Sequence, residues 1–374
     1  MMQGKKKFVV CLFIAFLVGF MSAAAGSALI FNAKYGDYGK YQRLGELYEK
    51  MDSLYYKDID DEDAVTGACK GLVEGLGDPY SAYMTAKEYK NYMTSVTGEY
   101  SGIGITFAED TAGFVVVSVH KDSPAEKAGI QPGDYILSVN DKEYSDLDVM
   151  ATDIRGETGT TVKIKYYNDE GEKEATLTRE EIVQESVEYE MIDQDTAYIQ
   201  ITSFIEATAD DFDKALKDAE AKGAKNLILD LRDNGGGLVN QCVDIADEFL
   251  DEGVVTYLED RKKNRQNYKS KDGKTDLNTI VLVNENSASA SEILAGALKD
   301  NGFKLVGQKT YGKGVVQGTE ELSDGSALKI TVAQYFSPDG HKVNKKGVTP
   351  DYIVENEKDS QTDLQLDKAL SLIQ

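Results

Sequence analysis

The chain has 374 residues, of which 41% are hydrophobic and 28% are charged, a composition typical of a globular protein with two or three domains. Its formal net charge is -24. Nucleic-acid binding needs a basic face, so we expect no nucleic-acid partner, and the same charge would repel the body of the chain from anionic lipid.

The first 33 residues differ from the rest. Three lysines at 5–7 precede an uncharged stretch at 8–31, which a signal peptide or a single spanning helix would both produce. The positive-inside rule then puts the rest of the chain outside the cytoplasm. Small residues at 23–25 offer a cleavage site, but the apolar run continues beyond them. We expect an extracytoplasmic protein anchored to the cell membrane by this segment, or secreted if it is cleaved near Ala25.

Two patterns follow in turn. From about residue 35 to 92 the apolar residues recur at helical spacing, as in Leu44, Leu47 and Met51, which predicts a helical region at 34–96. Its acidic run DIDDED (58–63) is expected to be a solvated loop that caps the next helix. Short β-rich runs then predict a small separate domain at 97–184, namely GIGITF, FVVVSV, YILSVN and TVKIKYYN.

From residue 188 strands and helices alternate, which predicts an α/β layer with its chemistry in the loops at strand ends. The alternating segments are AYIQIT, ADDFDKALKDAEAKG, NLILDL, LVNQCVDIADEFL, TIVLVN, SEILAGALKDNG and FKLVG. We expect this core at 185–350 and a C-terminal extension at 351–374.

Several kinds of site are disfavoured by residues that the chain lacks. It has two histidines, His120 and His341, and no GxSxG motif, which argues against a Ser-His-Asp triad and against a zinc site. The stretch GQKTYGKG (307–314) approaches a phosphate-binding loop. Gly314 stands where that loop carries a hydroxyl, however, and strand-like VVQGTE follows in place of a helix. We expect no metal, nucleotide or other cofactor.

Three serines lie in NENSASASE (284–292), between an apolar strand-like run and an apolar helix-like run. Ser289 and Glu292 form the pattern of a capping box, which explains the serines without any chemistry. A serine at such a turn also has an exposed hydroxyl beside the free N–H groups of a helix N-terminus, as a nucleophile needs. The pattern alone leaves both interpretations open.

Two further segments are candidates for chemistry, each with a plain structural alternative. Lys313 is flanked by glycines, and as a general base it must lose about 3 units from its ordinary pKa through burial. The glycines in NGGG (234–237) present N–H groups to an oxyanion or form a simple turn. In SGIGITF (101–107), alternating glycines either bind a carboxylate beside a strand edge that pairs with a peptide, or merely kink that edge.

Together these segments resemble the C-terminal processing peptidases, also called tail-specific proteases. The resemblance extends from about residue 40 to 374 and rests on motifs that occur in the order of that family. They are GLGDPYSAYM, SGIGITF, SPAEKAGIQPGDYILSVN, LILDLRDNGGGLV, NSASASEILAGALKDNG, TYGKGVVQ, KGVTPD and DLQLDKAL.

The resemblance implies an α/β multidomain protein: a crotonase-like α/β protease core with an inserted PDZ-like β-rich domain and an N-terminal helical region. It also implies a serine endopeptidase with a Ser-Lys dyad, in which Ser289 is the nucleophile, Lys313 the general base, and Gln317 the residue that orients the lysine. The N–H groups of Ala290 and Gly236 would hold the oxyanion.

In the PDZ-like domain, the resemblance implies that Gly102, Ile103, Gly104 and Ile105 receive the terminal carboxylate of protein or peptide substrates with free, apolar C-termini. Arg155, in IRGETG, is a candidate for coupling tail binding to activation. The N-terminal region is expected to form a homodimer, as in relatives, and residues 351–374 to pack on the core or on the dimer partner.

The sequence departs from the family pattern in two places. Gly235 stands where the family commonly has proline, which makes the oxyanion loop less rigid, and the 24 positions from Ser289 to Lys313 are one fewer than usual. The alternative function is an inactive tail-binding adaptor or chaperone with the same fold. The presence of serine, lysine and glutamine at the matching positions argues against it.

Overall fold

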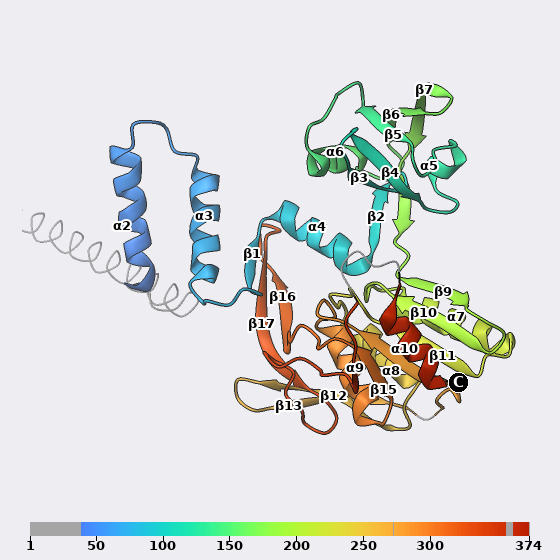
Figure 1. Ribbon diagram of the computed structural model, residues 1–374. Coiled ribbons are helices and arrows are strands. Elements are labelled where there is room, and N and C mark those ends of the chain that lie inside the picture. Colours follow the sequence, from blue (N-terminus) through green and yellow to red (C-terminus); the bar gives the residue numbers. More distant parts are fainter. Residues whose placement is uncertain (1–38, 272, 357–361, 374) are drawn as a thin grey trace, which may run out of the picture. The chain divides into compact units, whose positions relative to one another are not determined.

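A computed structural model describes residues 39–271, 273–356 and 362–373 (Figure 1). The segment expected to be a signal peptide or membrane anchor lies outside these residues. Among those that are described, no helix combines the length and the apolar character needed to cross a membrane.

The N-terminal helical unit contains α2 (Gly39–Leu54) and α3 (Asp61–Glu74). Asp60 ends the acidic loop between them, and its carboxylate accepts hydrogen bonds from the main-chain N–H groups of Glu62 and Asp63 at 3.0 and 3.1 Å. This is the cap that DIDDED predicts. The apolar residues of α2 at helical spacing are exposed: Leu44, Leu47, Met51 and Leu54.

The β-rich domain has its own buried core, which includes Ile103, Val116, Met150 and Ile164. Helix α4 (Ala86–Thr97) precedes it. An antiparallel sheet has the order β3-β4-β5-β6-β7, so β3 is an edge strand, and a separate pair, β2-β8, joins the entry and exit of the domain. The elements are β2 (Glu99–Gly102), β3 (Ile105–Glu109), β4 (Phe114–Val119), α5 (Pro124–Lys127), β5 (Tyr135–Val139), α6 (Leu147–Ile154), β6 (Thr161–Asn168), β7 (Gly171–Thr178) and β8 (Glu180–Val183).

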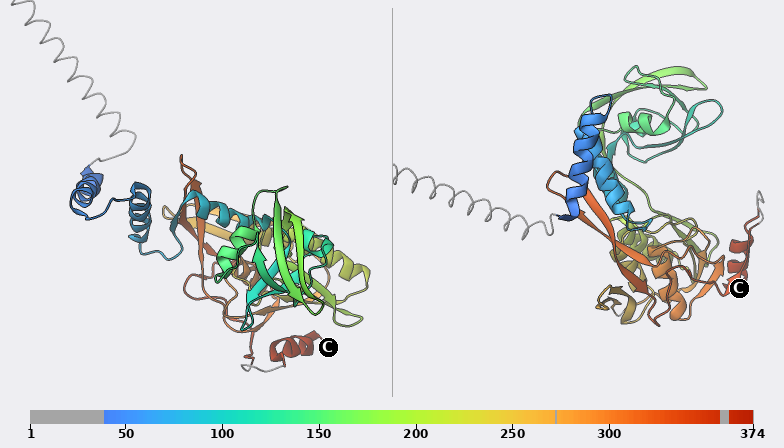
Figure 2. Two further views of the ribbon diagram at one scale, coloured as in Figure 1. Left: turned by 90° about the horizontal axis from the view of Figure 1, so that it is seen from above. Right: turned by 90° about the vertical axis from the view of Figure 1, so that its left-hand side faces the viewer.

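The α/β core contains a six-stranded sheet in the order β18-β15-β14-β11-β10-β9, parallel except for β9. Residues of α7, α8 and α9 pack with alternate strand residues such as Leu227 and Leu229. The helix α10, red in Figure 2, packs with the intervening residues, such as Ile228, on the opposite face. The elements are β9 (Val187–Met191), β10 (Thr196–Ile201), α7 (Thr208–Ala221), β11 (Asn226–Asp230), α8 (Val239–Asp247), β14 (Asn278–Val283), α9 (Ala290–Asp300), β15 (Lys304–Gly307), β18 (Tyr352–Ile353) and α10 (Leu364–Ile373).

A second sheet was missed by the sequence analysis, apart from the strand at VVQGTE. It has the order β1-β17-β12-β13, with β16 also paired to β17. Its strand β1 falls inside the region predicted to be helical, and β1 pairs with a strand some 245 residues later in the chain. The strands are β1 (Ala82–Met84), β12 (Gly253–Asp260), β13 (Arg265–Ser270), β16 (Val315–Glu321) and β17 (Ala327–Phe336).

Candidate active site

The turn between β14 and α9 holds the three serines of NENSASASE. Ser289 immediately precedes α9 and has φ 56° and ψ -113°, a strained backbone for a residue with a side chain. Ser287 and Ser291 are fully buried, and their hydroxyls donate to the main-chain oxygens of Leu231 and Asn234 at 2.7 and 2.9 Å. Ser289 is only half-buried, so it is the most accessible of the three.

Lys313 lies in the segment that joins β15 to β16 and is half-buried. Burial lowers the pKa of its ammonium group, the positive charge of Lys329 lowers it further, and the carboxylate of Glu292 partly opposes both effects. Gly314 allows close packing here, because a Cβ would lie 2.0 Å from the main-chain nitrogen of Asn344. The pKa is therefore shifted in the direction that a lysine base requires.

The carboxylate of Glu292 connects the serine turn to the lysine segment. It is fully buried, and its Oε2 accepts hydrogen bonds from the main-chain N–H groups of Ser289 at 3.0 Å and Lys313 at 2.8 Å. Its Oε1 accepts from the N–H of Gly312 at 2.7 Å and from the hydroxyl of Thr310 at 2.5 Å. The Tyr335 hydroxyl is a fifth donor, 3.4 Å from Oε2. This buried carboxylate therefore ties the two segments together.

The hydroxyl of Tyr335 lies at the same junction, 3.0 Å from the main-chain oxygen of Ser289 and 2.5 Å from that of Lys313. Burial and the carboxylate of Glu292 raise the pKa of this phenol well above its ordinary value, so it stays protonated as a donor. In the sequence, Glu292 is recognisable only as part of a helix cap, and no pattern marks Tyr335. The capping-box pattern of Ser289 and Glu292 was the one feature of the sequence that pointed to Glu292.

The two predicted oxyanion donors are neighbours. At Gly236, with φ 102°, a Cβ would lie 2.7 Å from the Cβ of Ser289 and 2.9 Å from the nitrogen of Ala290. The N–H of Ala290 has no acceptor among the described residues. The N–H of Gly236 donates to Oδ1 of Asn234 at 2.8 Å, so it would have to exchange that acceptor for an oxyanion.

Gln317 lies on β16, where its side-chain amide donates to the hydroxyl of Thr331 at 3.0 Å. The N–H of Thr331 in turn donates to the hydroxyl of Ser81, in the GLGDPYSAYM segment, at 3.1 Å. No hydrogen bond joins Gln317 to Lys313 in the part of the chain that the structure describes. Tyr80, the neighbour of Ser81, does contact the lysine: its ring centre lies 5.2 Å from Nζ.

One histidine does pair with an aspartate, because Nδ1 of His341 lies 3.0 Å from Asp300. Asp300 is the last residue of α9, whereas Ser289 precedes the first. Eleven residues of helix separate them by roughly 16 Å, at about 1.5 Å per residue. This pair therefore does not form a triad with Ser289.

The predicted carboxylate loop lies between two strands, since β2 ends at Gly102 and β3 begins at Ile105. Gly104 has φ 78°, and a Cβ there would lie 2.3 Å from the Cβ of Ser123. The N–H groups of Ile103 and Gly104 have no acceptor within the described ranges. The loop thus has free donors for a carboxylate.

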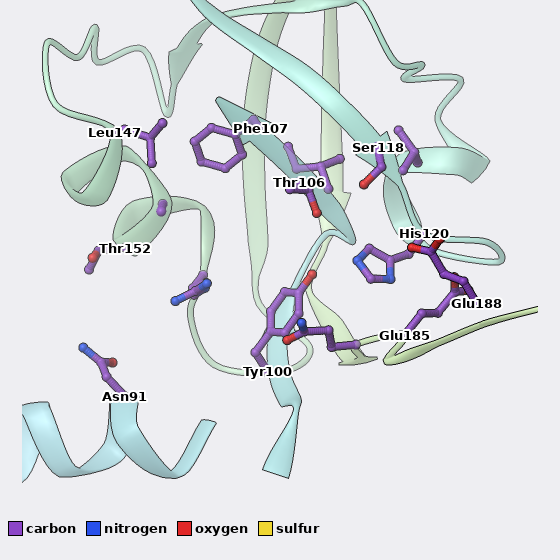
Figure 3. Close-up of a pocket in the computed structure, with 15 residues that line it drawn as sticks. Asn91, Tyr100, Thr106, Phe107, Ser118, His120, Leu147, Thr152, Glu185 and Glu188 are labelled. Atoms are coloured by element: carbon purple, nitrogen blue, oxygen red, sulfur yellow. The ribbon is translucent and has the colours of Figure 1, made fainter. Parts of the chain in front are cut away.

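Arg155 ends α6, and its guanidinium carbon lies 5.3 Å from the centre of the Tyr100 ring. Both residues line the cavity of about 760 Å³ that Figure 3 shows, together with Ile105 and Phe107 of β3. A second cavity, of about 30 Å³, is lined by Arg155 and by all four residues of the carboxylate loop. Arg155 and that loop therefore face a common space.

Residues 195–354 match the model of peptidase family S41, residues 101–178 that of the PDZ domain, and residues 27–88 that of the activating protease CtpB N-terminal domain. The carboxy-terminal processing protease CtpA of Bacillus subtilis is 40% identical over 325 residues, which cover 85% of this chain and 70% of that protein. A probable CtpA-like serine protease of Staphylococcus aureus is 38% identical over 329 residues, 86% of this chain and 66% of that protein.

Two solved structures are similar over most of the chain. A photosystem II D1 C-terminal processing protease has a TM-score of 0.52 and 28% identity, and the match covers 87% of this chain and 88% of that one. A putative S41 protease from Bacteroides fragilis has a TM-score of 0.55, and the match covers 81% of this chain and 89% of that one. At 18% identity the latter is a likeness of fold alone.

Proposed function

The chain belongs to peptidase family S41 and is a C-terminal processing serine protease, and from that premise we propose that Ser289 is its nucleophile and Lys313 its general base. The observation that carries this proposal is the shared carboxylate oxygen of Glu292, which accepts the main-chain N–H groups of both residues. The lowered pKa of the half-buried Lys313 supports it as well.

In the proposed reaction, neutral Lys313 takes the proton of the Ser289 hydroxyl as its oxygen attacks the scissile carbonyl. The N–H groups of Ala290 and Gly236 stabilise the negative charge that develops on the carbonyl oxygen. The lysine then gives its proton to the leaving amine, and an acyl-enzyme remains on Ser289. Lys313 next activates the water that releases it. We assign Gln317 the positioning of the lysine ammonium group, which requires it to leave Thr331.

We propose that the substrates are proteins whose free C-termini bind the PDZ domain. The loop from Gly102 to Ile105 would receive the terminal carboxylate, and the extended tail would pair with the open edge of β3. Ile105 and Phe107 supply apolar surface for its side chains. Arg155 faces the same cavity and is our candidate for relaying tail occupancy to the active site.

The location and assembly of the protein are also proposals. The lysines at 5–7 and the apolar run at 8–31 support an extracytoplasmic protein with a membrane anchor, and the exposed apolar residues of α2 support a homodimer through the N-terminal region. The full chain should be found in the membrane fraction, and protease added outside intact cells should digest it. Complete protection in unbroken cells would contradict this location.

The test of the catalytic proposal compares wild type with Ser289→Ala on an unfolded protein that ends in an apolar tail. We expect cleavage by the wild type alone, and a fluorophosphonate should label the wild type at Ser289. Cleavage by the Ser289→Ala variant would refute the assignment of the nucleophile. If the wild type bound the tail without cleaving or being labelled, the protein would be the adaptor instead.

A further inference from the structure

The large cavity of the PDZ domain has two chemically different walls, one on each side of β3 (Figure 3). On one side Phe107 and Leu147 form an apolar wall. On the other side lie Ser118 of β4 and His120 directly after it, together with two carboxylates, Glu185 after β8 and Glu188 of β9. A ligand that runs along β3 therefore contacts apolar groups on one side and acidic groups on the other.

An extended tail paired with β3 alternates its side chains between these walls, because successive residues of a strand point to opposite faces. Ile105 and Phe107 pack with the buried core of the domain, whereas Thr106 between them is exposed on the other face. If the terminal residue and the third from the end enter the apolar groove, the penultimate side chain faces the side that carries Glu185 and Glu188. We call this side the acidic wall.

Glu185 lines the large cavity from the segment that follows β8. This strand pairs with β2 through the register of Tyr100 with Ile182, and the N–H of Gln184 extends this pairing by donating to the main-chain oxygen of Gly98 at 2.9 Å. This antiparallel register places Glu185 opposite the residues that precede β2, and its side chain joins Tyr100 and His120 in the wall of the cavity.

Glu185 and Glu188 are exposed, and neither has an ion pair among the described residues. The lysine or arginine nearest to them in the cavity wall is Arg155, which instead lies against the ring of Tyr100. Two unpaired carboxylates at the mouth of a peptide site favour a cationic ligand group. We propose that the protein selects substrate tails with lysine or arginine as the penultimate residue, through Glu185 and Glu188.

This inference rests on the tail binding proposed above, and one binding experiment separates the two. Labelled peptides of one sequence, apolar at the last and third-last positions, would carry lysine, alanine or glutamate at the penultimate position. Fluorescence anisotropy would measure their binding to the full chain with Ser289→Ala, which prevents cleavage. We expect the lysine peptide to bind about 3- to 10-fold more tightly than the alanine peptide, the glutamate peptide to bind more weakly, and both differences to shrink in high salt.

Variants of the acidic wall give the decisive readout. Combined Glu185→Gln and Glu188→Gln should abolish the lysine preference, and Glu185→Lys should shift the preference towards glutamate. Glu190→Gln is the matched control, an exposed carboxylate on the same strand β9 as Glu188 but outside the cavity wall, and it should keep the preference.

Two results would overturn the inference. One is equal binding of the lysine and alanine peptides by the protein with Glu185 and Glu188 intact. The other is a lysine preference that survives in the double variant. Peptides with an amidated C-terminus test the underlying proposal. If they bound as well as the free acids, recognition of the terminal carboxylate would be refuted while the charge preference could still be read. No binding of any peptide would refute both.

Discussion

The main-chain N–H of Lys313 donates a 2.8 Å hydrogen bond to the carboxylate of Glu292. The same oxygen accepts the main-chain N–H of Ser289, and the other oxygen accepts Gly312 and Thr310. These four donors lie in the serine turn and the lysine segment, and the Tyr335 hydroxyl also bonds the main-chain oxygens of Ser289 and Lys313. The separation of the proposed nucleophile and base is therefore fixed by a buried carboxylate and a buried phenol rather than by either loop alone.

Replacing Glu292 by glutamine tests this arrangement. A glutamine would turn an NH₂ group towards two donors, and the loss of hydrogen bonds to a buried carboxylate costs about 3 kcal/mol in total. If a similar amount is lost from the transition state, kcat falls about 100-fold. Because the carboxylate raises the pKa of Lys313, its removal should also move the acid limb of the residual activity to lower pH.

The control for this variant is Glu285→Gln, which removes an exposed carboxylate from the same serine-rich turn. Its thermal stability and its pH–activity profile should match those of the wild type. An unshifted acid limb in Glu292→Gln, or an equal shift in both variants, would contradict a direct effect of Glu292 on the lysine.

Lys329 offers an independent test of the base. Its positive charge helps to lower the pKa of Lys313, so Lys329→Gln should raise that pKa. The active form of the lysine is neutral and exists above its pKa, so the acid limb of kcat/KM should move to higher pH. Lys262→Gln, in an exposed turn of the β12-β13 hairpin, is the control and should leave the profile in place. Identical profiles for all three proteins would argue against Lys313 as the base.

Two adjacent glycines give a matched pair for the oxyanion loop. At Gly236 an added Cβ meets Ser289 and Ala290 within 3 Å, whereas at Gly235 nothing lies within 4 Å. We expect Gly236→Ala to lose at least about 100-fold in kcat, the order of effect of losing one oxyanion donor, and Gly235→Ala to remain close to wild type. Measured kcat and melting temperature for both variants decide this, and equal activities would refute the role of Gly236.

The sequence predicted the parts of this protein that follow local rules. The alternation of strands and helices that gives the six-stranded sheet is visible as periodicity, and Asp60 caps α3 as DIDDED predicts. The second sheet could not be predicted in the same way. Its strand β1 has three residues, and its pairing with β17 depends on a partner far away in the chain.

The residues of the candidate site also divide into those that local patterns reveal and those that only the fold brings together. Ser289 and Lys313 stand in recognisable motifs, but the groups that hold them together were not predicted as such. Tyr335 lies near the end of an ordinary strand, β17, and its contacts with both segments follow only from the fold. Glu292 has a sufficient explanation as a helix cap, which concealed its bonds to the lysine segment. Local patterns show which residues can react and do not show what positions them.

The last prediction concerns the C-terminal helix and acid stability. Arg232, just before the oxyanion loop, donates to both oxygens of Asp363 at 2.9 and 2.8 Å. Burial opposes the charge of Asp363, but hydrogen bonds from Leu366 and Arg232 outweigh it and lower the pKa of this carboxyl. A carboxyl with a lowered pKa stabilises the fold above its unfolded pKa of about 3.9 and loses that contribution as the pH falls through its folded value.

The pair of Arg232 and Asp363 is partly exposed, so Asp363→Asn should cost about 1 kcal/mol of the free energy of unfolding at neutral pH. The difference from wild type should shrink at pH 3. Denaturant titrations at pH 7, 5 and 3 measure this, with Asp367→Asn, exposed in the first turn of α10, as the control. A difference that stays constant between pH 7 and pH 3 would show that the charge of Asp363 does not hold the helix.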